Sequence, residues 1–298
     1  MLMIYLLLTV LQVVFMMAGG VLIFESVCHS FATVATGGFS TRNNSIAAFS
    51  PYVQYVVMVF MVLAGTNFIV HYFMLRGQTR KALKDEELRF YWFVIIVTGL
   101  LVSGMLLFKM HLPAEKAFRD GFFQVISIIT STGFATADYL LWPGFATTIM
   151  FALLFVGGST GSTSGGIKMA RHLLVLKNIK STLHKTFSPN LVSVIKLNGQ
   201  EIPMNRNVTI LTFVLLYLFI FLISTIAMTF MGIDPETSAG SVATVMGGIG
   251  PGLGSVGPAG NFAHLPEMAK VLLSFLMIVG RLEIFTILAI FMPLFWKE

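Results

Sequence analysis

Three short glycine motifs are the parts of this chain whose residue types and spacing could do chemistry. They lie between long apolar runs, at residues 36–41 (Thr-Gly-Gly-Phe-Ser-Thr), 131–136 (Ser-Thr-Gly-Phe-Ala-Thr) and 247–252 (Gly-Gly-Ile-Gly-Pro-Gly). Glycine-rich backbone inside a bilayer must find partners for its carbonyl oxygens, because hydrocarbon offers none, and a desolvated cation is one such partner. The motifs contain no acidic residue. Backbone dipoles without carboxylates favour a monovalent ion over a divalent one.

The composition places these motifs in a membrane protein. The 298 residues are 56% hydrophobic and 11% charged, with a mean hydropathy of +0.86, whereas soluble domains have about 45–50% apolar and about 25% charged residues. The net charge of +6 comes largely from two basic stretches, 76–89 and 168–206, which follow apolar runs. Their placement indicates membrane orientation rather than nucleic-acid binding. The single cysteine, Cys28, excludes an internal disulfide, and the six histidines show no ligand spacing for a metal.

Six apolar runs approach the roughly 20 residues that a membrane span needs. They lie at residues 2–24, 52–75, 90–110, 142–156, 208–231 and 268–295. The fourth run is short, and the sequence allows it to continue through glycine-rich residues to about 180. Because Lys and Arg mark the cytoplasmic side, the basic stretches place all three glycine motifs on the outer side. We therefore expect short helices at 31–35 and 122–126 that dip into the membrane and return.

The motifs mark a repeated unit of span, re-entrant helix, glycine motif and span. Gly133 follows Gly38 by 95 residues, and Gly250 follows Gly133 by 117. Each re-entrant helix would direct its partially negative C-terminal end toward the membrane centre. Glycine would then let successive carbonyl oxygens face a common axis, as they do in potassium-type filters. Close helix packing through glycine is the alternative for any single motif, but three equivalent positions favour a filter.

The sequence thus predicts an all-α membrane protein built from pore units of potassium-channel type. The expected organisation is a pore unit at 1–75, a second at 90–180, a cytoplasmic connection at 181–207 and a third pore unit at 208–298.

A further glycine-rich segment, residues 157–168, follows the fourth apolar run. Its Gly161-x4-Gly166 spacing superficially resembles a phosphate-binding loop, but Ile167 separates the second glycine from Lys168 and no strand precedes the segment. A nucleotide site is therefore not expected. From the residues alone, packing or a hinge within a broken helix is the simplest interpretation.

Arg281 is the outstanding charge, because it stands near the middle of the apolar run 268–295. An ionised group at that depth is costly unless it faces protein or water and finds a partner. Glu283 is the nearest acidic residue, but residues two apart project from different faces of a helix.

In combination these segments resemble the Trk/Ktr/HKT superfamily of potassium transporters, and within it most closely the TrkH family, the membrane subunits of bacterial Trk potassium uptake. The two Gly-Phe motifs carry the resemblance, together with segments 157–168, 250–254 (Gly-Pro-Gly-Leu-Gly) and 280–285 (Gly-Arg-Leu-Glu-Ile-Phe). It covers essentially the whole chain. Family members carry four units around one pore, and this chain resembles the second, third and fourth. A fragment, an internal start or a split gene is the expectation.

The resemblance implies a filter of backbone carbonyls and, below it, an intramembrane loop that obstructs the pore and moves when it opens. The filter residues would be Thr36, Gly37, Gly38, Ser131, Thr132, Gly133, Gly248, Ile249 and Gly250, with potassium at the carbonyls of Gly38, Gly133 and Gly250. The gate residues would be Gly157, Gly158, Ser159, Thr160, Gly161, Gly165, Gly166, Lys168 and Arg281. Arg281 would interact with the loop or repel cations. In the third motif, Gly247 and Gly248 replace more polar residues, which leaves the filter geometry there open.

The implied activity is channel-like potassium uptake across a bacterial inner membrane, by a multi-pass protein that is not an enzyme and binds no cofactor beyond the transported ion. The implied partners are the lipid bilayer, a second copy in a homodimer and a cytosolic TrkA-type regulatory subunit, which alone would bind nucleotide; nucleic acid is not expected. A sodium-permeable member of the same family is one alternative. A secondary transporter with discontinuous helices for another small solute is the other, but three dipping segments of the same orientation favour a pore.

Overall fold

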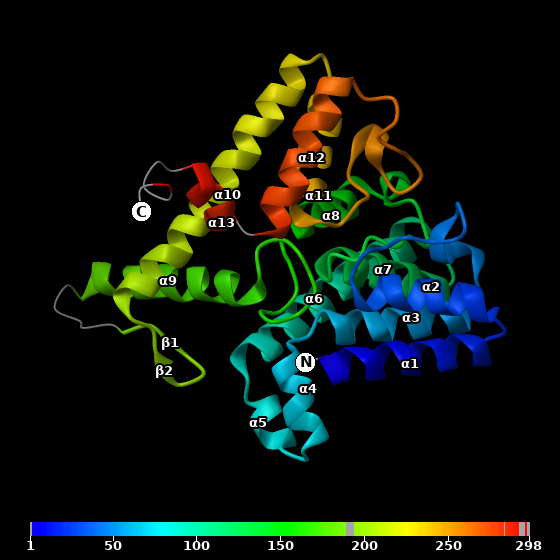
Figure 1. Ribbon diagram of the computed structural model, residues 1–298, viewed down its shortest axis with the longest axis horizontal. Coiled ribbons are helices and arrows are strands. Elements are labelled where there is room, and N and C mark those ends of the chain that lie inside the picture. Colours follow the sequence, from blue (N-terminus) through cyan, green and yellow to red (C-terminus); the bar gives the residue numbers. More distant parts are fainter. Residues whose placement is uncertain (1, 189–193, 283, 292–295, 297–298) are drawn as a thin grey trace.

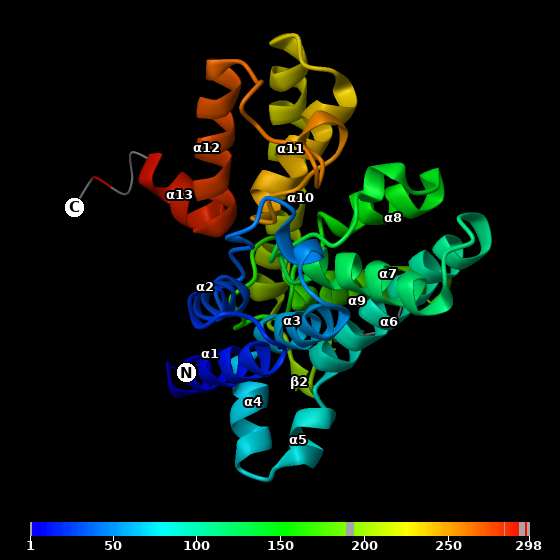
Figure 2. The ribbon, with the colours of Figure 1, turned by 90° about the vertical axis from the view of Figure 1, so that its right-hand side faces the viewer.

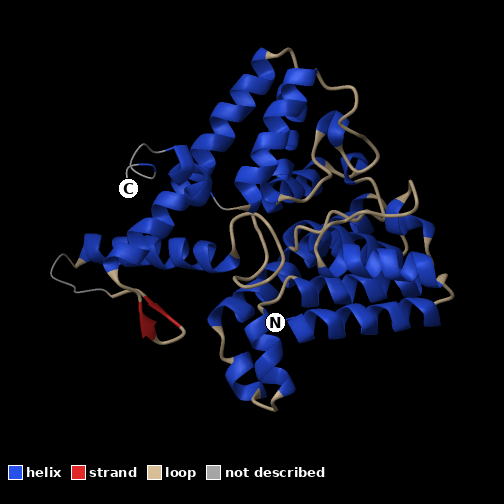
Figure 3. Ribbon diagram, in the orientation of Figure 1, coloured by secondary structure: helices blue, strands red, loops and turns tan. Residues whose placement is uncertain are grey.

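The computed structural model describes residues 2–188, 194–282, 284–291 and 296 (Figure 1). Within these residues the secondary structure is almost entirely helical, and strands are confined to one short hairpin (Figure 3). This agrees with the all-α membrane class that the sequence predicts.

The first unit places three helices side by side, with the second helix ending at the first glycine motif (Figure 1). Its elements are α1 (Leu2–Ala18), α2 (Ile23–Val34), the 3-10 helix η1 (Ser45–Ala48), α3 (Pro51–Ala64), α4 (Phe68–Leu75) and α5 (Thr79–Leu83). Helix α1 ends before Gly19 and Gly20, and Gly20 takes a left-handed φ of 82°. The expected run 2–24 therefore divides into the apolar helix α1 and the start of α2.

Helices α3 and α4 meet at an angle of 100°, so the apolar run 52–75 is not one straight helix. The break falls at Gly65, Thr66 and Asn67. The Asn67 side chain accepts a hydrogen bond from the Ile69 amide at 2.9 Å and so caps the start of α4. Glycine followed by a capping asparagine ends one helix and starts another even inside an apolar run.

The second unit contains a largely buried helix, α7, that leads to the second glycine motif. Its elements are α6 (Glu86–Lys109), α7 (Ala114–Ile129), the 3-10 helix η2 (Tyr139–Leu141), α8 (Gly144–Leu153) and α9 (Met169–Phe187). Helices α6 and α7 pack closely because glycines lie at their contact: a Cβ on Gly99 would lie 2.5 Å from the Phe122 ring. Residues 154–168 are not helical. The fourth span therefore does not continue as a helix through the glycine-rich segment, although α9 resumes beyond it.

The third unit begins at the hairpin and ends in a second bent pair of helices. Its elements are β1 (Lys196–Leu197), β2 (Gln200–Glu201), α10 (Met204–Phe230), α11 (Pro235–Gly247), the 3-10 helix η3 (Gly254–Val256), α12 (Glu267–Arg281) and α13 (Ile284–Phe291). Helices α12 and α13 meet at 112°. The run 268–295 is therefore not one straight span, and Arg281 lies at its break; residues 292–295 lie outside the described residues.

The apolar segments coincide with the six expected runs, but they differ in how completely each could cross a bilayer. Helices α6 and α10 are long and apolar enough to do so alone, and each bent pair could supply one more span. Helices α1 and α8 are apolar but shorter, with 17 and 10 residues. Figure 2 shows α12 and α2 on one side of the molecule and α7 and α8 on the other.

Candidate functional site

The three glycine motifs share one backbone conformation. Each follows the C-terminus of a re-entrant helix, α2, α7 or α11, and each has two positive φ angles two residues apart. The pairs are Thr36 and Gly38 (51° and 68°), Ser131 and Gly133 (54° and 87°), and Gly248 and Gly250 (64° and 112°). The dihedral pattern therefore aligns Gly38, Gly133 and Gly250, in the register that the sequence predicts. It also aligns Gly248 with Thr36 and Ser131.

The amide groups of each motif turn back onto the helix that precedes it. In the first motif, the Gly37 and Gly38 amides donate to the Ala32 carbonyl at 2.7 and 3.3 Å. The second motif repeats this at Ser127, with distances of 2.9 and 3.3 Å, and the third at Thr244, where the Ile249 amide donates to the carbonyl at 3.0 Å and the Gly250 amide to Oγ1 at 3.1 Å. Because the donors are used by the helix, the motif carbonyls are left to accept from, or coordinate, another partner.

Neighbouring motifs touch through their glycines. A Cβ added to Gly38 would lie 1.9 Å from the Thr132 carbonyl oxygen, and one added to Gly133 would lie 1.8 Å from the Ile249 carbonyl oxygen. No other residue type fits at such an approach, since real Cβ contacts are never that short. A Cβ on Gly250, in contrast, would meet no atom within 4 Å. The first motif thus touches the second and the second touches the third, but the ring is open beyond Gly250.

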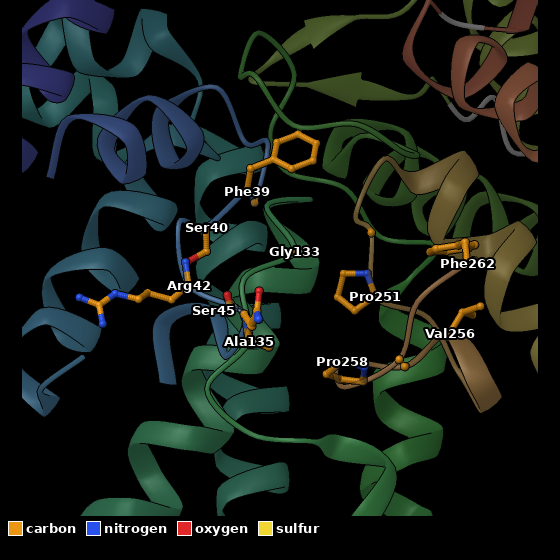
Figure 4. Close-up of a pocket in the computed structure, with 15 residues that line it drawn as sticks. Phe39, Ser40, Arg42, Ser45, Gly133, Ala135, Pro251, Val256, Pro258 and Phe262 are labelled. Carbon is orange, nitrogen blue, oxygen red and sulfur yellow. Dashed lines mark hydrogen bonds between the residues drawn. The ribbon is translucent and has the colours of Figure 1, made fainter. Parts of the chain in front are cut away.

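Two cavities meet at these glycines. The mouth cavity, of about 240 Å³, is lined by all three glycines and by the chain segments that follow them. Figure 4 shows Pro251, Pro258 and Phe262 on one side of it and Ser45 and Ala135 on the other. The open-side cavity, of about 630 Å³, also reaches the three glycines, and it extends along α12 past Lys270 to Arg281.

Charged groups at the outer end of the site are paired. Arg42 Nε lies 2.6 Å from Glu25 Oε1, and this hydrogen bond holds the pKa of Glu25 below its ordinary value of 4.5. Asp234 caps α11 by accepting from the Thr237 amide at 2.8 Å, and this bond lowers the pKa of Asp234. Of the two acidic residues, Asp234 therefore caps its helix, whereas Glu25 pairs with an arginine of the loop that follows the motif.

The segment 157–168, called the intramembrane loop below, lies against the ends of two re-entrant helices. The Thr36 hydroxyl donates to the Thr163 carbonyl at 2.9 Å, and the Thr163 hydroxyl donates to the Val34 carbonyl at 2.9 Å. A Cβ on Gly165 would lie 2.4 Å from the Gly247 carbonyl oxygen. The loop therefore contacts the first motif directly and approaches the start of the third at backbone distance.

The same loop docks on the break between α3 and α4. The Ser159 amide donates to the Gly65 carbonyl at 2.9 Å, and the Phe68 amide donates to the Gly161 carbonyl at 3.2 Å. The break leaves these backbone groups without helical partners, and the loop satisfies them. Residues 157–168 are thus non-helical, and their docking surface was not foreseen from the sequence.

The two predicted gate cations lie in different surroundings. The Lys168 ammonium donates to the carbonyl and hydroxyl of Ser164 and so closes the loop on itself. Arg281 is exposed at the end of α12 and lines the open-side cavity together with Gly248 and Gly250. Its contact with the loop stays a prediction, and the pairing with Glu283 falls on a residue outside the described ones.

Glu87 was not recognised from the sequence, although it contacts the loop directly. Its buried carboxylate accepts from the amides of Thr160 and Ala170. In the sequence, Asp85, Glu86 and Glu87 precede an apolar run and have the ordinary composition of a helix N-terminus. Of these three acidic residues only Glu87 is buried, and the sequence does not distinguish it from the other two.

Hydroxyl groups also distinguish the motifs. Ser127 Oγ donates to the Phe134 carbonyl at 2.6 Å, and Thr244 Oγ1 donates to the Pro251 carbonyl at 2.8 Å. The equivalent position in the first unit is Ala32, which has no hydroxyl. Among the described residues, the buried Oγ of Ser131 finds no hydrogen-bond partner, in contrast to the equivalent Thr36 hydroxyl, which bonds Thr163.

Comparison with known proteins gives one consistent family. A family model described as "TrkH: Cation transport protein" matches residues 1–297. The Trk system potassium uptake protein TrkH of Escherichia coli K12 is 35% identical over 99% of this chain and 61% of its own length. The Trk system potassium uptake protein TrkG of the same organism is 34% identical over 94% of this chain and 58% of its own length.

Comparison with solved structures points to the same family. The crystal structure of the potassium transporter TrkH from Vibrio parahaemolyticus superimposes with a TM-score of 0.93, at 33% identity, over 99% of this chain and 64% of that one. The chain spans about three fifths of the length of the curated relatives it matches. On its sequence and its fold, it belongs to the TrkH family of cation transport proteins.

Proposed function

We propose that this chain forms three quadrants of a potassium-uptake pore, with Gly38, Gly133 and Gly250 at its filter. The observation that carries this proposal is the shared conformation of the three motifs: two glycines touch the carbonyl of the next motif, and all three line one cavity. The N–H groups of the motifs are bonded to the preceding helices, and the motif carbonyl oxygens suit a dehydrated cation.

The filter assignment extends to the residues around these glycines. Thr36, Gly37, Ser131, Thr132, Gly248 and Ile249 occupy the equivalent positions before them. The absence of carboxylates from the motifs favours a monovalent ion. Potassium is proposed because the relatives are named as potassium uptake proteins.

The intramembrane loop is proposed as the gate. Its hydrogen bonds to Thr36 and Val34 support a position at the inner end of the proposed filter, where a segment of backbone would block an ion path. Its glycines 157, 158, 161, 165 and 166 allow movement, and two of them, Gly161 and Gly166, already take left-handed φ angles of 75° and 67°. Arg281 adds a positive charge on the open side of the same path, which opposes cation passage.

A fourth unit is proposed to complete the ring at the open-side cavity. Phe39 is 82% exposed, whereas the equivalent Phe134 is 0% exposed and packs near His29 of the neighbouring re-entrant helix at 6.0 Å between ring centroids. Gly250 lacks a neighbour on its free side. Both edges of the ring are therefore unpartnered at the same cavity, as a missing quadrant between the third and first units requires.

The proposed partners follow from the family. A regulatory subunit that binds nucleotide would dock on the basic cytoplasmic side, where α5 carries Arg80 and Lys81 and α9 carries Lys180 and Lys185. A homodimer is likewise proposed. Copurification of a second, differently tagged copy and of the regulatory subunit tests these two partners separately.

Potassium uptake tests the central proposal. The chain is expressed alone, and also joined to the segment of Escherichia coli TrkH that it does not match, in cells that lack potassium uptake. Whichever of the two forms, the chain alone or the joined chain, restores growth at low potassium is called the active form below. We expect the joined form to restore growth and to accumulate rubidium. Failure of both forms, with protein present in the membrane, would reject a potassium pore.

Competition by sodium separates the alternatives within the family. In the active form, excess sodium should leave rubidium uptake nearly unchanged if the filter selects potassium. Equal inhibition by sodium and potassium would indicate a sodium-permeable member. Gly38, Gly133 and Gly250 are also substituted one at a time. If the ion preference stays unchanged in all three variants, the filter assignment is wrong.

A further inference from the structure

A buried carboxylate joins the two ends of the intramembrane loop. Glu87, in the first turn of α6, is 6% exposed. Its Oε1 accepts hydrogen bonds from the backbone amide of Thr160 at 2.5 Å and from that of Ala170 at 3.1 Å. Thr160 belongs to the loop, and Ala170 lies in the first turn of α9, directly after it. One oxygen atom on a separate helix therefore holds both the loop and the helix that continues from it.

Helix α9 depends on this carboxylate for its cap. Its own N-cap residue, Lys168, makes no capping side-chain hydrogen bond, and its ammonium group is directed to Ser164. The first amides of a helix lack partners and carry partial positive charge, so an anion stabilises them. A buried carboxylate needs such donors in turn, because it is costly without them. Glu87 and the loop amides thus stabilise each other.

The bonds of Glu87 differ in kind from the other contacts that dock the loop. The contacts with Gly65, Val34 and Thr36 are bonds between uncharged groups. A hydrogen bond to an ionised group is roughly twice as strong as one between neutral groups. The loop is therefore held most firmly at the side that faces α6.

We propose that Glu87 is the latch of the gate: its two hydrogen bonds hold the intramembrane loop in the position that obstructs the pore, and opening breaks them. This inference rests on the proposed function, since the loop obstructs a pore only if the motifs form one. Glu87 acts through the loop and contacts no filter residue, so it is a positioning residue.

The latch adjoins a cytoplasmic contact. Asn198, at the tip of the β1–β2 hairpin, accepts from the Glu86 amide at 2.7 Å and donates to Asp85 Oδ2 at 2.8 Å. These two residues immediately precede Glu87 on the chain. Lys177 of α9 also pairs with Glu86. A displacement of the hairpin would therefore be transmitted through one turn of α6 to the latch.

Hydrogen exchange of the purified chain tests whether Glu87 holds the loop. Glu87→Ala should make the amides of Thr160 and Ala170 exchange roughly tenfold faster, because both lose a charged acceptor. Glu87→Gln, which keeps an oxygen acceptor without the charge, should give a smaller increase. Glu236→Gln is the matched control, since it removes an exposed carboxylate from the first turn of another helix, α11. Unchanged exchange in both Glu87 variants, or an equal rise throughout α7, would overturn the proposal.

Uptake by the active form tests whether the latch restrains the gate. Glu87→Gln and Glu87→Ala should raise the initial rate of rubidium uptake while leaving the preference over sodium unchanged, because the filter is untouched. Faster loop exchange with unchanged or slower uptake would refute the gating role. If the unsubstituted protein transports nothing in either form, the proposed function fails, whereas the exchange experiment still decides whether Glu87 holds the loop.

Discussion

Thr36 and Ser131 occupy a backbone conformation that suits glycine, and the third motif has Gly248 in that place. A left-handed conformation costs a residue with a β-carbon about 1–2 kcal/mol. The first two motifs therefore hold local strain that the third does not, and in return they keep hydroxyl groups beside the proposed filter. The Thr36 hydroxyl is used, since it bonds the intramembrane loop. In the first unit, the residue with the strained backbone is therefore the same residue whose side chain binds the intramembrane loop.

Substitution of Gly133 should be more damaging than substitution of another glycine with a similar φ. Gly133→Ala places a Cβ 1.8 Å from the Ile249 carbonyl oxygen at a φ of 87°, whereas Gly20→Ala, at a φ of 82°, meets no atom within 4 Å. We expect Gly20→Ala to lower the free energy of unfolding by about 1–2 kcal/mol and Gly133→Ala to lower it by clearly more. Thermal unfolding in detergent measures both. Equal losses would show that the motifs do not touch as described.

A hydroxyl at position 32 should stabilise the first motif. Ala32→Ser places a donor where Ser127 and Thr244 bond the carbonyl seven residues later, which in the first unit is Phe39. We expect a gain of about 0.5–1.5 kcal/mol in the free energy of unfolding, measured by thermal unfolding, and a comparable loss for Ser127→Ala. A destabilising Ala32→Ser would indicate that the first motif differs in conformation from the other two.

The ion pair between Glu25 and Arg42 should make stability depend on pH in the acid range. Because the bond with Arg42 holds the pKa of Glu25 below 4.5, its contribution is complete above pH 4.5 and is lost as the pH falls through the lowered value. The difference in unfolding temperature between the unsubstituted protein and Arg42→Gln should therefore be constant from pH 7 to about pH 5 and shrink at lower pH. A difference that persists unchanged to pH 3 would contradict this linkage.

Among the elements, the re-entrant helices followed from the sequence but the helix breaks did not. Apolar runs placed before glycine motifs predicted α2, α7 and α11, although the expected windows 31–35 and 122–126 were shorter than the helices themselves. The breaks after α3 and α12 were missed, because the residues on both sides of each break are apolar. A hydropathy pattern shows that a segment is apolar, but it does not show where the helix axis changes direction. The signal for the first break, Gly65 followed by Asn67, is present in the sequence, but its docking partner lies almost a hundred residues away in the intramembrane loop.

The site was foreseen to a similar extent. Register alone aligned Gly38, Gly133 and Gly250. Glycine is required at Gly38 and Gly133 because the chains approach there at backbone distance, whereas at Gly250 only the positive φ of 112° favours it. Glu87 was not foreseen, because burial of one acidic residue among three depends on α9 lying across α6. Contacts between distant elements therefore account for the part of the site that the sequence did not predict.

The β1–β2 hairpin offers a test of how an element is fixed to its neighbours. Asn198 has a φ of 51° and is followed by Gly199 at 76°, the conformation of a tight Asn-Gly turn. Asn198→Gly should keep this turn while removing the side chain that bonds Asp85 and the Glu86 amide, so the Glu86 amide should exchange faster and the hairpin bond from Ile202 to Ile195 should persist. Asn198→Ala should weaken both. An unchanged Glu86 amide in Asn198→Gly would show that the hairpin is held by other contacts.

At the scale of the whole molecule, the open side of the ring should be covered when the fourth unit is present. Phe39 is 82% exposed beside a cavity of about 630 Å³, whereas the equivalent Phe134 is fully buried between two units. In a Cys28→Ser background, which leaves no other thiol in this chain, and with any cysteine of the added segment replaced by serine, Phe39→Cys should react with a maleimide in the chain alone and be protected in the joined form. Phe134→Cys should be protected in both, because units present in this chain already cover it. Equal labelling of Phe39→Cys in the two forms would place the fourth unit elsewhere, and the quadrant between α12 and α2 would then face lipid.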